Sequence, residues 1–339
     1  MKRVIRPFGL RDVSALKQLQ PRGVAFDLRR VLLSSISPTR SALLGYLTAH
    51  HWGAITCVHD NTENGDKGIV QVWPRRDRKA WDLAFLAPSL DEDPNAPGIW
   101  QKLLTHLILL GAEQGVLRIY ARSSEDAEAE DILRQTGFSM VTREEVFVLS
   151  HQPAPAPLPR GLRRVEVEDR WALDKFHSQV IPPLMKKAED PSFDICAVSS
   201  DPFRLRDVQE YVWSKKGEII AWLRLASSPQ GHWLDVVVRP EYRAESLPYI
   251  RYMLTLANVS KQTPLYCSIP DYCVGLGWLL RTLGFSTFTR QALLVAHTIA
   301  RVPVRRHLVL PALERSIDVG PSVAPVHPDG GKTGAKLTA

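Results

Sequence analysis

The sequence has few of the features that mark secreted, membrane-spanning or metal-binding proteins. Its 339 residues include only four cysteines, and none of them forms a CxxC pair: Cys57, Cys196, Cys267 and Cys273. That scarcity argues against a disulfide framework and favours a reduced, cytoplasmic compartment. No apolar run approaches the roughly 20 residues that cross a bilayer. Residues 1–7 also lack the apolar core of a signal peptide, so we expect no membrane association.

Metal-ligand spacing is missing as well. His50 and His51 are adjacent and have no partner at ligand spacing, so we predict no metal site. Positive charge, in contrast, is abundant, because 43 Lys and Arg against 36 Asp and Glu give a net charge of +7. A basic surface favours anionic partners such as phosphates or nucleotides. Without zinc-finger spacing or a basic motif interleaved with aromatic residues, nucleic acid is a disfavoured partner.

One stretch of the chain occurs twice. Residues 133–143 and 280–290 are identical at seven of eleven positions, at an offset of 147 (280 − 133). Each copy predicts a helix that ends at a glycine, Gly137 or Gly284, and continues directly as a strand. Glycine suits this corner because it adopts the left-handed conformation of a helix end without a Cβ penalty. We infer an internal duplication.

Further matches extend the duplication along the chain. Asp12 aligns with Asp169 at an offset of 157, and Pro88 aligns with Pro240 at an offset of 152. Matches that keep their order while their spacing changes are typical of two related domains with different loop lengths. We predict an N-terminal domain over 1–149, a Pro/Ala linker over 150–160, a C-terminal domain over 161–300 and a disordered tail over 316–339.

Each half predicts the same order of elements. A strand and helical segments come first, followed by a three-stranded meander, a helix, a strand, and the duplicated helix–strand corner. The predicted meander strands are 54–58, 68–73 and 81–86 in the first half and 208–213, 218–225 and 233–238 in the second. This pattern predicts an α/β (α+β) fold with a sheet of mixed strand direction in each half.

That order, with Val238-Arg239-Pro240 closing the fourth strand and a helix–Gly–Phe corner near the end, resembles the GCN5-related N-acetyltransferases (GNAT proteins). The resemblance covers residues 1–150 and 161–300, and two copies in one chain are similar to the tandem acyltransferases of that group. It implies two GNAT-like, mixed-sheet acyl-CoA N-acyltransferase domains in tandem. It also implies acetyl-CoA, held between two splayed parallel strands, as the acyl donor and an amine as the acceptor.

The same resemblance implies where the cofactor lies. The loop after the fourth strand presents backbone amides to the pyrophosphate from a helix N-terminus, while the strand itself pairs with the pantetheine arm. The matching positions are Phe85, Leu86, Asn95, Ala96, Gly98, Ile99 and Trp100 in the first half, and Val236, Val238 and Arg243 in the second. The first half keeps Gly98, whereas Glu245 in the second half would repel a pyrophosphate. We therefore expect the first half to bind acetyl-CoA better.

Candidate catalytic groups are few. Asp82 and Asp235, on the two fourth strands, are the candidate bases, although most such acids are solvated or capping carboxylates. Leu133 and Leu280 stand at the position of the family's usual tyrosine acid. We therefore expect a reaction without an acid from the late helix, unless another tyrosine takes that role: Tyr120, Tyr242 or Tyr272.

Two functions remain open from the sequence. The first is an N-acetyltransferase for an amine that the sequence does not identify, because acceptor loops vary freely on a shared fold. The alternative is a non-catalytic module on the duplicated fold that senses CoA or binds another protein. Neither reading fixes the oligomeric state.

Overall fold

The computed structural model describes residues 5–34, 37–49, 53–61, 65–75, 79–124, 127–183, 185 and 207–298. The predicted tail over 316–339, the His50-His51 pair and Cys196 lie outside these residues. Residues 1–301 form one compact unit.

The elements of the first half follow the predicted order. The chain begins with β1 (Ile5–Pro7), α1 (Val13–Leu19), β2 (Val24–Ala25), α2 (Leu28–Leu33) and α3 (Pro38–Leu47). The meander consists of β3 (Ile55–Asn61), β4 (Asp66–Pro74) and β5 (Ala80–Ala87). It is followed by α4 (Ala96–Glu113), β6 (Arg118–Ser124), α5 (Ala127–Gln135) and β7 (Phe138–Leu149).

The second half repeats this order. It begins with β8 (Leu162–Arg164) and α6 (Arg170–Val180), and its meander consists of β9 (Asp207–Lys215), β10 (Glu218–Ser228) and β11 (Gly231–Val238). It ends with α8 (Leu247–Leu256), β12 (Leu265–Pro270), α9 (Leu276–Thr282) and β13 (Ser286–His297).

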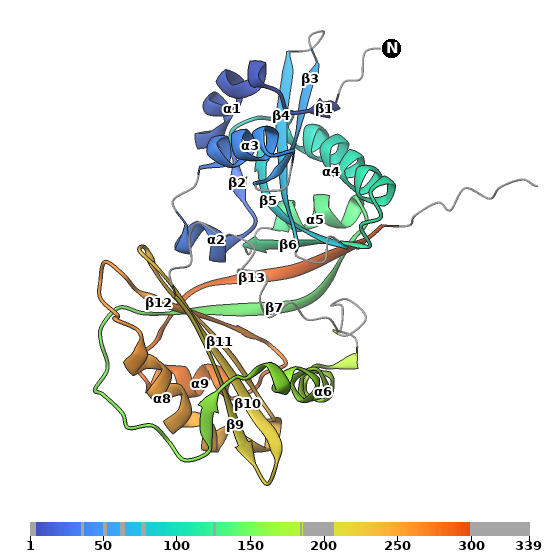
Figure 1. Ribbon diagram of the computed structural model, residues 1–339. Helices are drawn as coiled ribbons and strands as arrows, with labels where there is room; N and C mark the ends of the chain where they lie inside the picture. The colour runs from blue at the N-terminus through green and yellow to red at the C-terminus, as the bar shows by residue number, and fades with distance from the viewer. Residues whose placement is uncertain are drawn as a thin grey trace, which may run out of the picture. The chain divides into compact units, whose positions relative to one another are not determined.

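The strands of both halves form one continuous sheet (Figure 1). Its order is β1-β3-β4-β5-β6-β13-β7-β12-β11-β10-β9-β8, and β2 pairs with β5 beside this path. The two halves thus have the same strand order, as the duplication predicts. Each half, however, gives its last strand to the other, since β13 pairs with β6 and β7 pairs with β12. The predicted boundary between separate domains at 150–160 stays a prediction, because the sheet runs through both halves.

The two exchanged strands also pair with each other, antiparallel. Gln291 of β13 lies directly opposite Glu144 of β7. These two positions are equivalent in the duplication, since they differ by the same offset of 147 (291 − 144). A pseudo-twofold axis therefore passes through this pair. Antiparallel pairing of equivalent strands is the arrangement that such an axis requires.

The duplicated corners have the predicted geometry. Gly137 and Gly284 have φ angles of 97° and 94°, and the phenylalanines that follow them are buried. A second duplicated feature is an ion pair at the start of each half. Arg6 donates to Asp12 at 2.6 Å, and Arg163 donates to Asp169 at 2.6 Å, at the offset of 157.

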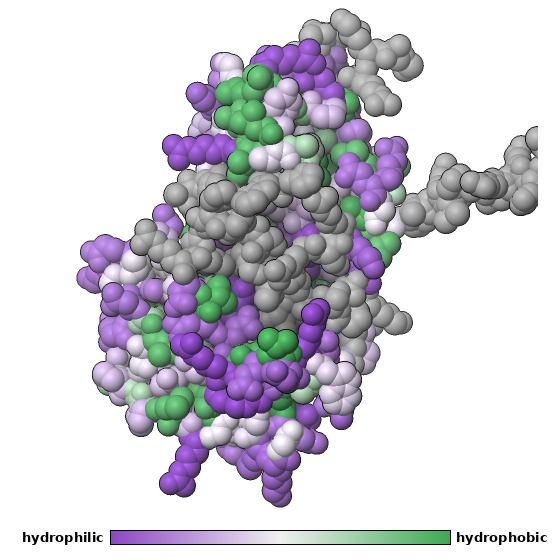
Figure 2. Space-filling view, in the orientation of Figure 1, coloured by the Kyte–Doolittle hydropathy of each residue, from purple (hydrophilic) through white to green (hydrophobic). Residues whose placement is uncertain are grey.

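The helices that cover the sheet bury one apolar face each, whose side chains recur at helical spacing. Ile99, Leu103 and Leu107 of α4, four residues apart, are buried in the core of the first half. Ile250 and Met253 of α8 lie in the core of the second half. On the face that Figure 2 shows, apolar groups alternate with polar ones. No helix in the described ranges has the length and apolar character needed to cross a membrane.

Candidate functional site

Each half contains two parallel strands that pair briefly and then separate. In the first half, Ala80–Asp82 of β5 pairs with Arg118–Tyr120 of β6. In the second half, His232–Leu234 of β11 pairs with Leu265–Cys267 of β12. Beyond these residues the facing strand edges need other hydrogen-bond partners. We call the spaces between the separating strands the first cleft (β5 and β6) and the second cleft (β11 and β12).

The first cleft is filled by the protein's own chain. Strand β2 pairs antiparallel with β5, with Val24 opposite Leu86 and Ala25 opposite Phe85. The next residue, Phe26, joins both sides of the cleft. Its amide donates to the Ala84 carbonyl at 2.9 Å, and its carbonyl accepts from the Arg122 amide at 3.3 Å. The backbone of Phe85 and Leu86, where we expected pantetheine, therefore pairs with residues 24 and 25.

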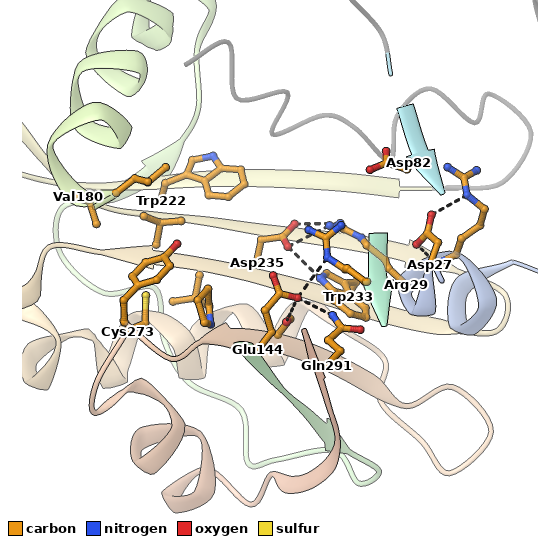
Figure 3. A pocket seen from close by; sticks show the side chains of 18 of the residues that line it. Asp27, Arg29, Asp82, Glu144, Val180, Trp222, Trp233, Asp235, Cys273 and Gln291 are labelled. Atoms are coloured by element: carbon orange, nitrogen blue, oxygen red, sulfur yellow. Dashed lines mark hydrogen bonds and ion pairs between the residues drawn. The ribbon is translucent and has the colours of Figure 1, made fainter. Parts of the chain in front are cut away.

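The second cleft is built differently. Within the described ranges, no strand lies between the separated parts of β11 and β12. They open instead into a cavity of about 210 Å³. One end of this cavity is mainly apolar (Figure 3), and these residues line it: Val180, Ile181, Trp222, Val236, Val237, Pro270, Tyr272 and Cys273. Burial raises the pKa of Cys273 to about 11, so its thiol is protonated and unsuited to nucleophilic attack.

The other end of the cavity is charged. Four carboxylates and four arginines line it: Asp27, Asp82, Glu144 and Asp235, with Arg29, Arg30, Arg75 and Arg122. Each carboxylate forms an ion pair with one of these arginines. These charges come from both halves of the chain, and Figure 3 shows Glu144 and Asp235 on the side of the charged end that is nearer to the apolar end.

The two predicted bases are both held by arginines. Arg75 donates to Asp82 through Nε and Nη2, the shorter contact being 2.7 Å. Burial alone would raise the pKa of Asp82, but Arg75 outweighs it, and the pKa is lowered. Asp235 accepts from Arg29 at 3.1 and 3.0 Å and from the Trp233 indole at 3.0 Å. Carboxylates with donors on both oxygens are poorly suited to accept a substrate proton.

Glu144 differs from these two carboxylates. Its Oε2 accepts from Gln291 at 2.6 Å, from Ser268 at 3.2 Å and from Arg122 at 3.3 Å. No donor from the described part of the chain lies on its Oε1. Ser268 is the first residue of β12 beyond the pairing with β11, so Glu144 lies at the vertex of the second cleft. A buried carboxylate that lines a cavity, with donors on one oxygen only, can accept a proton.

Comparison with solved structures identifies this architecture. A GCN5-related N-acetyltransferase from Sphaerobacter thermophilus matches with a TM-score of 0.50 and 15% identity, over 87% of this chain and 95% of that one. A tandem GNAT protein from the clavulanic acid biosynthesis pathway matches with a TM-score of 0.51 and 13% identity, over 87% and 98%. The chain has a tandem GNAT fold. No protein-family description and no curated protein matches the sequence.

The loop of the first half that we expected to hold a pyrophosphate lies at the start of α4. Ala96, Ile99 and Trp100 are buried, and the Trp100 indole donates to the Pro88 carbonyl at 2.7 Å. The Asn95 amide donates to Asp93 at 2.9 Å, and a Cβ added at Gly98 would contact nothing within 4 Å. Three acidic residues precede this helix start and oppose an anion there: Asp91, Glu92 and Asp93.

The corresponding loop of the second half leads into α8. Arg243 donates to the Val274 carbonyl at 3.0 Å, while Lys215 lies 3.5 Å from Glu245. Lys215 therefore offsets the negative charge that we expected to repel a pyrophosphate. Val236 lines the cavity, whereas Val238 is buried in the core of the second half.

The tyrosine position of the GNAT late helix is apolar in both halves, since Leu133 and Leu280 are buried in the two cores. Of the other tyrosines considered, Tyr272 lines the cavity. Tyr120 is buried beneath Arg75, whose guanidinium carbon lies 3.8 Å from the ring centroid. Tyr242 packs against Trp213.

Glu144 and Arg29 were not among the residues predicted from the sequence. The sequence did carry a signal for Glu144. The offset of 147 aligns it with Gln291, so the two copies of the duplication have an acid and its amide analogue at the same position.

Within the described ranges, no group of three or more His, Cys, Asp or Glu side chains is arranged to hold a metal ion.

Proposed function

We propose that the protein transfers an acyl group, acetyl in the simplest case, from acyl-CoA to a polar amine. The acyl-CoA arm would bind in the second cleft. The first cleft supports this proposal, because an extended segment, Val24–Phe26, satisfies the facing backbone groups there. The pantetheine arm is also extended and carries amide groups. It can pair with the edges of the second cleft as an added strand does.

The surroundings of α8 suit the rest of the donor. Arg243 lies just before this helix, and a guanidinium beside a helix N-terminus favours a pyrophosphate. Lys215 reduces the repulsion from Glu245. This assignment differs from the expectation that the first half binds acetyl-CoA better, because that expectation rested on Gly98 and did not include β2.

The acyl group of acyl-CoA is held as a thioester. The amine nitrogen bonds to the acyl carbon, the carbon–sulfur bond breaks, and CoA leaves as its thiolate. Glu144 accepts the proton of the amine on Oε1, and Ser268, Gln291 and Arg122 hold Oε2 in place. The amine approaches from the charged end of the cavity, where the arginine–carboxylate pairs favour a polar acceptor. The arrangement of donors around Glu144 at the vertex of the second cleft carries this proposal.

The test combines binding and turnover. Acetyl-CoA is titrated into the protein by calorimetry, and CoA release is then followed with a panel of polar amines and apolar arylalkylamines. Glu144→Gln keeps the shape of the side chain but removes the base, so it should lower kcat by about 10²- to 10⁴-fold with little change in acetyl-CoA affinity.

Glu145→Gln is the matched control, because Glu145 is the next residue of β7 and pairs with Arg281 at 2.6 Å outside the cavity. Its kcat should stay close to that of the wild type. Equal losses in both variants would contradict the role of Glu144. Acetyl-CoA binding without turnover of any amine would favour the non-catalytic CoA-sensing module instead.

A further inference from the structure

The segment that fills the first cleft fits tightly against β5. A Cβ added at Gly23 would lie 2.1 Å from the Phe85 ring and 2.9 Å from the Leu86 carbonyl, so only glycine allows this approach. Phe26 is 1% exposed, and its ring meets Trp100 edge-on at 5.6 Å. Backbone pairing, close approach and an aromatic anchor therefore hold residues 23–26 in the first cleft.

The same segment continues directly into the charged end of the cavity. Asp27 caps α2, because its carboxylate accepts from the Arg30 amide at 3.0 Å. Two residues after Asp27, Arg29 reaches β11 of the second half. Its guanidinium donates to both oxygens of Asp235 and lies 5.1 Å from the Trp233 ring centroid.

Helix α2 itself packs on the second half. Leu33 of α2 is buried in one cluster with Trp233 of β11 and Tyr266 of β12, and with Val146 of β7. The helix is only six residues long, too short to be stable without such packing. Its position is therefore set at one end by the segment in the first cleft and along its length by β11.

We propose that residues 23–29 form a strut in which Phe26, fixed in the first cleft, positions Arg29 against Asp235 at the vertex of the second cleft. The first cleft would then serve as an anchor for the site of the other half. Arg29 is a positioning residue, since it acts by holding the Asp235 carboxylate away from the reacting groups. This inference rests on the proposed function only for the expected changes in kcat and KM.

If the strut exists, Phe26 affects the second cleft through Arg29, and changes at the two residues have the same cause. Arg29→Ala should lower kcat by on the order of tenfold, because Asp235 loses its fixed position beside the cleft. Phe26→Ala should lower kcat to a similar degree without raising the KM for the amine in proportion. The double variant should be no worse than Arg29→Ala alone, since coupled residues give non-additive losses.

Phe8→Ala is the matched control. Phe8 is a buried phenylalanine of the first half in a different cluster, formed with Leu16, Ala42, Val58 and Ile69. It should leave kcat unchanged, and its combination with Arg29→Ala should equal Arg29→Ala. If Phe26→Ala does not fold, Phe26→Leu is compared with Phe8→Leu in the same way.

A second readout needs no activity. Hydrogen–deuterium exchange of the peptide that covers β11 should become faster in Phe26→Ala and in Arg29→Ala, but not in Phe8→Ala. This measurement tests the strut even if no amine is turned over, so its failure is distinct from failure of the proposed function. Independent multiplicative losses in the double variant, or unchanged exchange in β11 with Phe26→Ala, would overturn the strut.

Discussion

His177 illustrates how burial sets the protonation state of a single residue in this protein. Its ring lies in α6, 5.5 Å from the ring of Trp222, which lines the cavity. Burial lowers the pKa of His177 from 6.5 to about 4. The ring is therefore neutral at physiological pH and belongs to the apolar wall behind the cavity.

This shift has a defined effect on stability. The unfolded chain binds a proton at His177 below about pH 6.5, whereas the folded protein binds it only below about pH 4. The free energy of unfolding should therefore be highest above pH 6.5 and fall by up to about 3 kcal/mol between pH 6.5 and pH 4 from this group alone. Urea unfolding at pH 7 and pH 4.5 measures the loss.

His177→Leu should reduce the acid-induced loss of stability, whereas His151→Gln, a change at an exposed histidine, should not. An unchanged loss in His177→Leu would show that His177 does not carry the effect.

At the scale of elements, the helix–strand corners depend on backbone conformation alone. Gly137 has a φ of 97°, and a Cβ added there would contact nothing within 4 Å. A Cβ added at Gly98 in α4 would also contact nothing. Since steric clash is absent at both positions, a comparison of the two isolates the effect of the positive φ at Gly137.

Gly137→Ala should lower the free energy of unfolding by about 1–2 kcal/mol, because alanine is strained in the left-handed conformation. Gly98→Ala should raise it by up to about 1 kcal/mol, because alanine favours a helix. Equilibrium denaturation of both variants provides the comparison. Equal effects at the two glycines would contradict a conformational role for Gly137.

These corners were predictable because they are local: a glycine ends a helix and a β-rich run follows. The meander strands were also predicted within a few residues, since alternation and turn residues act over short distances. The filling of the first cleft was not predictable, because Val24–Phe26 is too short a segment to give a strand pattern. Its conformation depends on the edges of β5 and β6, which lie far along the chain.

At the scale of the whole molecule, the exchange of β7 and β13 joins the two halves. Sequence patterns identify a strand but not its partner, so both strands were predicted while their exchange was not. Glu144 was missed for the same reason, because the pairing of β7 with β13 brings it beside Gln291 and the pairing of β7 with β12 brings it beside Ser268.

The exchange predicts that the two halves unfold together. Without β13, strand β6 and much of β7 in the first half lose their partner, and exposed edges favour aggregation. The full chain should therefore show one cooperative transition in calorimetry, with equal calorimetric and van't Hoff enthalpies. Residues 1–149 produced alone should be insoluble or unfolded. Two resolved transitions, or a stable isolated first half, would contradict this coupling.

The pairing of Glu144 with Gln291 has a consequence for how the chain arose. A symmetric homodimer of one half would bring two copies of the same side chain together on its axis. Two glutamates would repel each other so strongly that one would take up a proton, whereas two glutamines would leave no base at all. Once both copies reside in a single gene product, each can mutate without the other. Fusion of the halves thus permits what symmetry forbids: a single acid on the axis, hydrogen-bonded by its own neutral counterpart.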